Sequence, residues 1–149
     1  MFILHHRQVV LDISGYNCLA MINKSKKNFE ISKIEADVSF PMEISILSCP
    51  VEAVEIPKPR EGEEKPVRDI TEQVKSNIIG KKVKTSAIFH AHPEVDESKT
   101  KKITSVQLEK GIPINMVDEL TLKSGQALIV RAKPAEVNNV VNITINYTE

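Results

Sequence analysis

The C-terminal end of the chain has the most regular alternation of hydrophobic and polar positions. From residue 141 onward every second side chain is apolar, and those between are Asn or Thr; the apolar members are Val141, Ile143, Ile145 and Tyr147. Successive side chains of a β-strand point to opposite faces, so the pattern indicates a strand with one buried side and one solvent-facing side. A second alternation surrounds the turn Lys123-Ser124-Gly125, with Leu120 and Leu122 before it and Leu128 and Val130 after it. Both patterns predict antiparallel sheet packed on a single face.

Shorter apolar stretches of the same kind occur along the rest of the chain, separated by turn residues. They predict further strands over residues 8–13, 16–22, 29–38, 42–47, 84–90 and 103–108. About nine short strands with closely spaced turn signals are typical of a sandwich or a barrel. We therefore predict an all-β fold, a single antiparallel, jelly-roll-like β-sandwich over residues 1–149. A closed barrel has the same alternation and is the alternative.

One segment interrupts the strand pattern. Residues 52–69 are rich in charged residues and proline, with polyproline character at Pro57-Lys58-Pro59, so we predict an exposed charged loop or arm there. Residues 70–80 fit one short helix, with Asp69 as its N-cap, Glu72 completing a capping box and Gly80 as its stop; a strand is the alternative for the same residues.

The composition narrows the classes of function. Twenty basic and twenty acidic side chains cancel, so no overall field draws the protein to nucleic acid or to an anionic membrane. The apolar stretch after Met1 is too short for a signal peptide, and no stretch approaches a transmembrane length, so we expect synthesis and retention in a cytoplasm. Cys18 and Cys49 are then expected to be reduced, with a disulfide between them as the alternative.

The four histidines form two close pairs, His5-His6 and His90-Ala91-His92. On a strand, His90 and His92 would share one face, a spacing that some zinc sites use, and His5 and His6 would supply further ligands. Because Pro93 follows at once and no Cys, Asp or Glu stands nearby in a recognisable ligand pattern, we assign no metal site.

Catalytic patterns are not evident in the sequence. Ser14-Gly15 and Ser124-Gly125 are ordinary turn pairs outside any nucleophile elbow, and no glycine-rich phosphate loop is present. Lysines cluster at 24–27, 81–84 and 99–102 without the aromatic residues of a single-strand nucleic-acid platform, so we interpret them as protection of sheet edges. We assign no catalytic or cofactor-binding residue and predict that the protein is not an enzyme.

Three parts of the chain resemble small virion proteins of tailed bacteriophages. The first is the run Leu120-x-Leu122-x-x-Gly125-x-x-Leu128-x-Val130-x-Ala132 with the final strand Val141 to Glu149, and the second is residues 20–24 followed by residues 29–34. The third is the middle of the chain, residues 87–89 and then 103–108 before Gly111-Ile112-Pro113. The resemblance extends over most of residues 16–48 and 84–149. The chain departs from those proteins in its Pro- and charge-rich 52–69 segment, where they tend to be rich in Gly, Ser and Thr, and in its many lysines.

The resemblance implies a non-enzymatic β-sandwich on a phage head, neck or tail, present in symmetric or repeated copies. Its expected partners are other virion proteins (capsid, neck or tail) and further copies of itself, with no nucleic acid and no membrane, and its expected location is the virion, assembled in the host cytoplasm. Two alternatives remain from the residues alone. One is a receptor- or carbohydrate-binding module on the same scaffold, and the other is a small cupin-like metal enzyme that uses His90 and His92.

Overall fold

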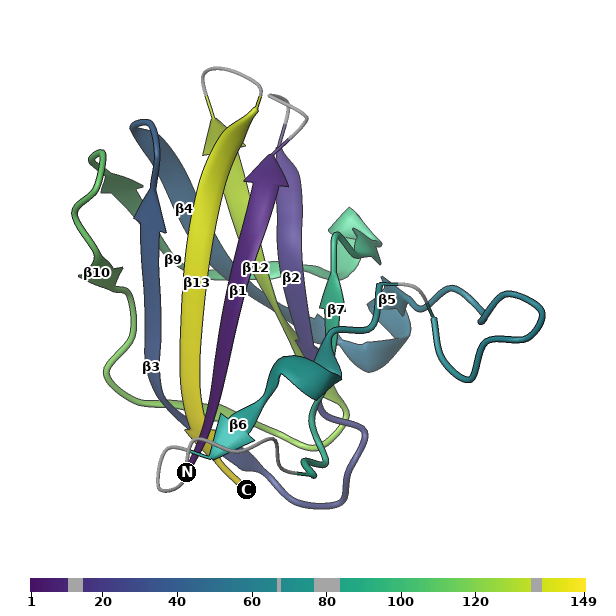
Figure 1. Cartoon of the computed structure of the whole chain (residues 1–149). Coiled ribbons are helices and arrows are strands. Elements are labelled where there is room, and N and C mark those ends of the chain that lie inside the picture. Colours follow the sequence, from purple (N-terminus) through teal and green to yellow (C-terminus); the bar gives the residue numbers. More distant parts are fainter. Residues whose placement is uncertain (11–14, 67, 77–83, 135–137) are drawn as a thin grey trace.

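Two antiparallel β-sheets pack face to face in the computed structural model, which describes residues 1–10, 15–66, 68–76, 84–134 and 138–149. Figure 1 shows the two layers with the N- and C-termini at the same end of the molecule. This arrangement confirms the predicted antiparallel β-sandwich.

The first sheet is built around three long strands and the second around four. The first sheet has the order β10 (Ile114–Asn115), β3 (Phe29–Val38), β13 (Asn139–Thr148), β1 (Phe2–Val10) and β6 (Lys75–Ser76), and β11 (Leu120–Leu122) also pairs with β3. The second sheet has the order β7 (Ile88–Ala91), β2 (Tyr16–Ile22), β12 (Gln126–Pro134), β4 (Met42–Pro50) and β9 (Lys101–Leu108). A small ladder joins β5 (Val54–Glu55) to β8 (Glu94–Val95). Single 3₁₀ turns occur at Val51–Ala53, Thr71–Gln73 and Glu97–Lys99.

The connections explain how the two sheets are held together. The first four strands pass from one sheet to the other in turn, so β1 and β3 lie in the first sheet and β2 and β4 in the second. The last two long strands then insert between them: β12 pairs with both β2 and β4, and β13 pairs with both β1 and β3. Each central strand is therefore supplied by the C-terminal end of the chain and depends on partners from the N-terminal third.

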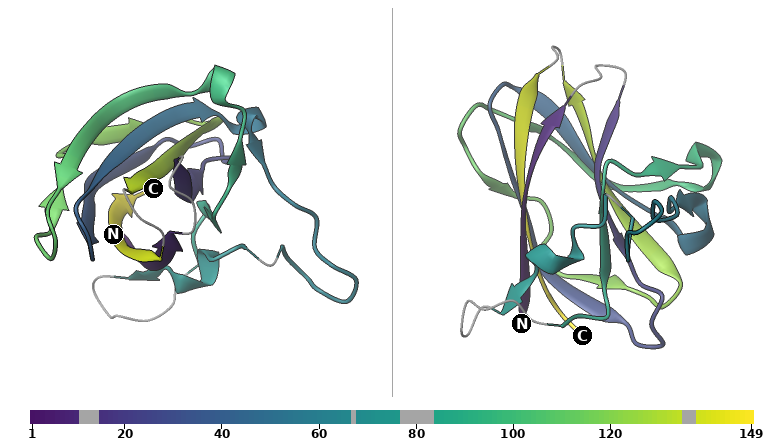
Figure 2. Two further views of the ribbon diagram at one scale, coloured as in Figure 1. Left: turned by 90° about the horizontal axis from the view of Figure 1, so that it is seen from above. Right: turned by 45° about the vertical axis from the view of Figure 1, so that its right-hand side comes forward.

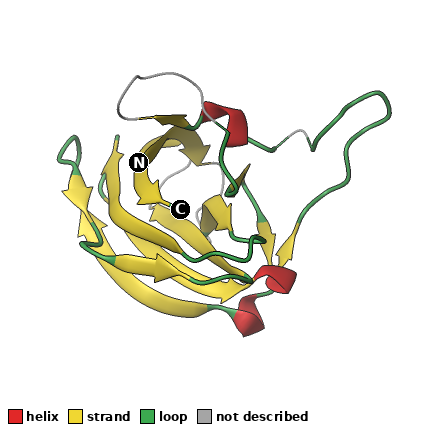
Figure 3. Ribbon diagram, turned by 90° about the horizontal axis from the view of Figure 1, so that it is seen from below, coloured by secondary structure: helices red, strands yellow, loops and turns green. Residues whose placement is uncertain are grey.

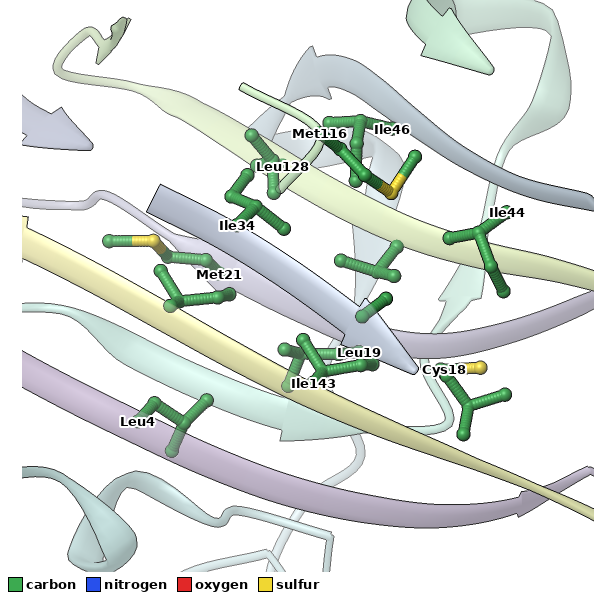
Figure 4. Close-up of a cluster of buried hydrophobic side chains, with 14 of the residues drawn as sticks. Leu4, Cys18, Leu19, Met21, Ile34, Ile44, Ile46, Met116, Leu128 and Ile143 are labelled. Atoms are coloured by element: carbon green, nitrogen blue, oxygen red, sulfur yellow. The ribbon is translucent and has the colours of Figure 1, made fainter. Parts of the chain in front are cut away.

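The main core lies between the two sheets. Figure 4 shows side chains from both layers meeting there, with Leu4, Ile34 and Ile143 from the first sheet and Met21, Ile44 and Leu128 from the second. Tyr147 and Phe29, also buried in this core, have ring centroids 6.0 Å apart, within the range of favourable aromatic pairs. With few aromatic residues, the core is filled mainly by branched aliphatic side chains, which suit a pleated surface.

The alternation predicted for the last strand is confirmed. Along β13 the apolar side chains from Val141 to Tyr147 are at most 1% exposed, while Asn142 and Thr148 are exposed. The prediction of one wet face is wrong for β12, however, because Ala127 and Ile129 are also fully buried. They belong to a second hydrophobic cluster on the outer side of the second sheet.

This second hydrophobic cluster is covered by the β5–β8 ladder and the turn before it. Its buried members are Ala20, Ile22, Leu47, Cys49, Ala53, Val54, Ala127 and Ile129. Figure 2 shows the covering segments on the outer side of the second sheet, away from the main core. Strands buried on both faces need continuous apolar sequence rather than alternation, which explains the apolar runs in β2 and β12.

Two local predictions need correction. The first strand runs over Phe2–Val10 rather than residues 8–13, and residues 11–14 lie outside the described part of the chain. The helix predicted at 70–80 is a single 3₁₀ turn at Thr71–Gln73 followed by β6, and residues 77–80 are not described. Asp69 still accepts a hydrogen bond from the backbone N–H of Thr71, at 2.9 Å, as a capping residue does.

Candidate interaction surface

Residues 56–66 leave the sandwich as a charged arm that projects sideways from the body. Figure 3 shows this arm extending well beyond the two sheets and returning to them. Residues 58–64 are all exposed, and the whole arm, residues 56–66, carries three basic and three acidic side chains. The arm is shorter than the predicted 52–69 segment, since Ala53 and Val54 are buried in the second hydrophobic cluster.

The outgoing end of the arm is fixed by the β5–β8 ladder. Val54 pairs with Val95 and Glu55 pairs with Glu94, and the backbone N–H of Asp96 donates to the carbonyl of Ala53 at 2.8 Å. Ile56, the first residue of the arm, packs against the second hydrophobic cluster. Burial of these apolar side chains therefore holds the arm at the point where it leaves the sheet.

The returning end of the arm is fixed against the edge of β7. The backbone N–H of Ala91 donates to the carbonyl of Arg68 at 2.9 Å, and the N–H of Ile70 donates to the carbonyl of Phe89 at 2.9 Å. The guanidinium of Arg68 donates to the carbonyl of His92 at 2.6 Å. These bonds close the open edge of β7 and leave the arm with two fixed ends.

The tip of the arm is a tight turn. The N–H of Glu63 donates to the carbonyl of Arg60 at 3.0 Å, and the Glu63 carboxylate accepts a bond from the N–H of Arg60 at 3.3 Å. Gly62 has φ of +84°, a left-handed conformation that a residue with a Cβ rarely adopts. The tip of the arm therefore exposes basic and acidic side chains on a short turn of defined geometry.

The base of the arm is acidic. Glu52, Glu55, Glu94 and Asp96 line an open depression of about 470 Å³ beside the β5–β8 ladder. Hydrogen bonds from the side chain and backbone of Ser98 lower the pKa of the Asp96 carboxyl. This carboxyl is therefore held in its charged form, and the base of the arm offers an acidic surface that suits a partner bearing basic groups.

The two pairs of histidines do not form a site. β7 ends at Ala91, and His92 turns out of the strand with φ of +47° and stacks on Tyr16 at a centroid distance of 4.4 Å. His90 stays on the strand and is 1% exposed. His5 and His6 lie on β1 of the first sheet, where His5 bonds to Thr144 and His6 bonds to Gln8. Within the described ranges, no group of three or more His, Cys, Asp or Glu side chains is placed to hold a metal ion.

The remaining candidates lie in structural positions. Cys18 and Cys49 are free and buried, Cys18 in the main core and Cys49 in the second hydrophobic cluster, so they lie on opposite faces of the second sheet. Burial raises the pKa of the Cys18 thiol to about 12. Ser124 bonds to the carbonyl of Ser25 within a turn, whereas Ser14, Lys81 and Lys82 lie outside the described residues.

Sequence reasoning did not identify the residues that fix the two ends of the arm. The pairing of Val54 with Val95 and of Arg68 with Ala91 joins segments that are far apart in the chain and individually too short to show a period. Asn23 was also missed: it is fully buried and donates to the carbonyls of Lys27 and Leu122, at 2.8 and 3.0 Å. In hindsight, an uncharged Asn among the lysines of the 23–28 turn was the available signal.

Comparisons with protein-family models, curated proteins and solved structures gave no match. In the described part of the chain, no helix has the length and hydropathy needed to cross a membrane.

Proposed function

We propose that this protein is a non-enzymatic structural component of a tailed-bacteriophage virion. It acts as a capsid decoration or auxiliary protein, or as an accessory component of the neck or tail. Its partners are other virion proteins and further copies of itself, and its working surfaces are protein–protein contacts. The pattern of turns and strands that resembles such virion proteins supports this proposal, together with the sandwich architecture.

The observation that carries the proposal is the charged arm with its two fixed ends. Most connections between strands in compact domains are short. A long, exposed loop without secondary structure is therefore typical of a functional segment. Ordering an extended segment on a partner costs conformational entropy, and fixed ends reduce that cost. The arm is therefore suited to contact a neighbouring subunit of an assembly.

The position of the aromatic rings favours protein contacts over sugar binding. Sugar sites use exposed aromatic faces, but Phe29, Phe89, Tyr16 and Tyr147 are buried, and Phe2 is partly buried and stacks on Tyr147. Phe40 is 48% exposed and lies alone in the turn between β3 and β4. We therefore rank the carbohydrate-binding alternative below a structural role.

The arm is tested by replacing residues 58–64 with a Gly-Ser segment of the same length. Residues 54–56 are kept because they belong to the β5–β8 ladder and the second hydrophobic cluster. We expect an unchanged unfolding temperature, because all seven replaced positions are exposed, and roughly tenfold lower incorporation into particles, the effect of losing about 1.4 kcal/mol of contacts.

The measurement is the amount of variant in purified particles when it competes with the wild-type chain. A variant with Lys26→Ser and Lys123→Ser serves as the control, since it removes exposed charge away from the arm and should incorporate normally. Normal incorporation of the arm variant would remove the basis for assigning the arm to assembly.

A further inference from the structure

β9 is an edge strand whose outer side is open. The other sheet edges are covered in part by short segments of the same chain: β6 pairs with β1 at Phe2 and Ile3, β10 and β11 pair with β3, and residues 68–70 bond to β7. β9 pairs with β4 on one side, and no described residue bonds to the backbone on its other side. An open edge of this length displays unpaired N–H and C=O groups that can template another strand.

Only the first part of β9 carries the usual protection against such pairing. Lys101 and Lys102 begin the strand, and the register with β4 shifts between Ile46 and Leu47, where Ile103 is left without a partner. Residues 103–108 then contain no charged side chain, and Ile103 is 41% exposed. This uncharged composition is typical of a strand that has a hydrogen-bonded neighbour on both sides.

We propose that β9 pairs with β9 of a second copy of this chain, antiparallel and centred on Ser105. The two five-stranded sheets would then form one continuous sheet across a two-fold axis. Identical strands related by such an axis are self-complementary, so a single edge serves both copies. The half-buried Val106 and Thr104 of each copy would lie opposite one another and complete the inner face.

Charge and side-chain direction select this register. Side chains alternate between faces. Only registers that shift the second strand by an even number of residues therefore keep its inner side chains on the inner face of the sheet. Because Ile103 is an extra residue in the ladder, centring on Ser105 places Lys102 opposite Gln107 and Lys101 opposite Leu108 of the second copy, so no like charges oppose one another. Centring on Val106 would bring Lys101 opposite Lys110, whereas centring on Thr104 would place Lys101 opposite the half-buried Val106.

Pairing through β9 would supply one contact between the repeated copies of the proposed assembly. Only its role in a particle rests on the proposed function. The pairing is measured on the isolated protein, so its failure would leave virion incorporation untouched. Conversely, a protein absent from particles could still form the β9 dimer.

The first test is sedimentation of the wild-type chain together with a cysteine placed on the axis. Both native cysteines are buried, so Ser105→Cys creates the only exposed thiol among the described residues. Opposed residues of an antiparallel pair have Cα atoms about 4.5–5.5 Å apart, within the range that a disulfide spans. We expect the wild-type protein to form dimers in a concentration-dependent way as its concentration is raised to about 1 mM. The variant should form a covalent dimer on mild oxidation.

Gln107→Cys is the matched control, exposed on the same strand but off the axis. In the proposed register its two copies lie four residues apart along the strands, about 13 Å, too far for a disulfide. Equal cross-linking of the two variants would overturn the register. A wild-type protein that stays monomeric throughout, with no cross-linking at Ser105→Cys, would overturn the pairing itself.

The second test changes the charge opposite Lys102. Gln107→Lys sets a like charge opposite Lys102 of the second copy, twice, and should weaken association roughly tenfold, whereas Gln107→Glu creates two attractive pairs and should strengthen it. Two variants that associate equally would contradict this register.

Discussion

His90 is a buried ionisable side chain among the described residues. It is 1% exposed, and its Nε2 atom has no hydrogen-bond partner in the part of the chain that is described. Burial lowers the pKa of His90, since it disfavours the charged imidazolium; the carboxylate of Asp69 opposes this, and Arg68 and Lys24 add to the lowering. Burial therefore favours the neutral imidazole of His90 in the folded protein.

This placement predicts that stability depends on pH. In the unfolded chain His90 takes up its proton near pH 6.5, whereas in the folded protein it does so only at lower pH. The unfolded state therefore binds more protons in this window. The unfolding free energy should be fully present above about pH 7 and fall as pH drops through 6.5 towards the folded pKa.

Denaturant unfolding between about pH 5 and pH 8 checks this expectation. His90→Gln removes the titrating group and should flatten the dependence, whereas His5→Gln removes an exposed imidazole and should keep it. An equally steep fall in the His90→Gln variant would show that another group is responsible.

At the residue scale, sequence could identify which positions alternate but not what surrounds them. The pair His90 and His92 was predicted to share a face, yet the strand ends at Ala91 and His92 turns away. Pro93 signalled that the strand stops nearby, but the bond from Arg68 to the carbonyl of His92 comes from a distant segment. Such long-range bonds leave no local pattern.

At the scale of elements, the second hydrophobic cluster is what makes the arm possible. It buries the outer face of β2, β12 and β4 under the β5–β8 ladder, and so anchors the chain on either side of the arm's outgoing end. Ile129 is fully buried at its centre, on the face opposite the main core.

Ile129→Ala should therefore lower the unfolding free energy by about 2–5 kcal/mol, the cost of lost burial plus a residual cavity. Ile112→Ala is the matched control, because Ile112 is 55% exposed and should change stability by no more than about 0.5 kcal/mol. Denaturant unfolding at pH 8 measures both. Equal, small effects would mean that the ladder does not pack on the sheet.

The elements differed in how visible they were in the sequence. β13 was predicted correctly because it has one wet face, which gives a clear period of two. β1 was predicted too short, since His6 and Gln8 take positions on its inner side and hide the alternation that starts at Phe2. β5 and β8, at two residues each, have no period to detect.

At the scale of the whole molecule, the fold class followed from the sequence while the topology did not. Many alternating strands separated by turns indicate a sandwich, but nothing local determines that β12 and β13 insert between the first four strands. The turn at Gly125 illustrates this: it joins β11 of one sheet to β12 of the other, although the sequence around it looks like a hairpin.

The same topology separates two surfaces on one body. The charged arm returns to the molecule against β7, at one edge of the second sheet, whereas β9 forms the opposite edge of that sheet. A copy can therefore pair through β9 and still present its arm to a different neighbour. This arrangement suits a component that is used repeatedly in a larger shell or tube.

The most direct test of the proposed role is quantitative mass spectrometry of phage particles purified from the source of this chain. The virion assignment predicts peptides of this protein at a fixed ratio to the major capsid protein in intact, protease-treated particles. Hundreds of copies would place it on the capsid surface, and about a dozen or fewer would place it at the neck or tail, following the symmetry of those parts. Its complete absence from infectious particles would contradict the account.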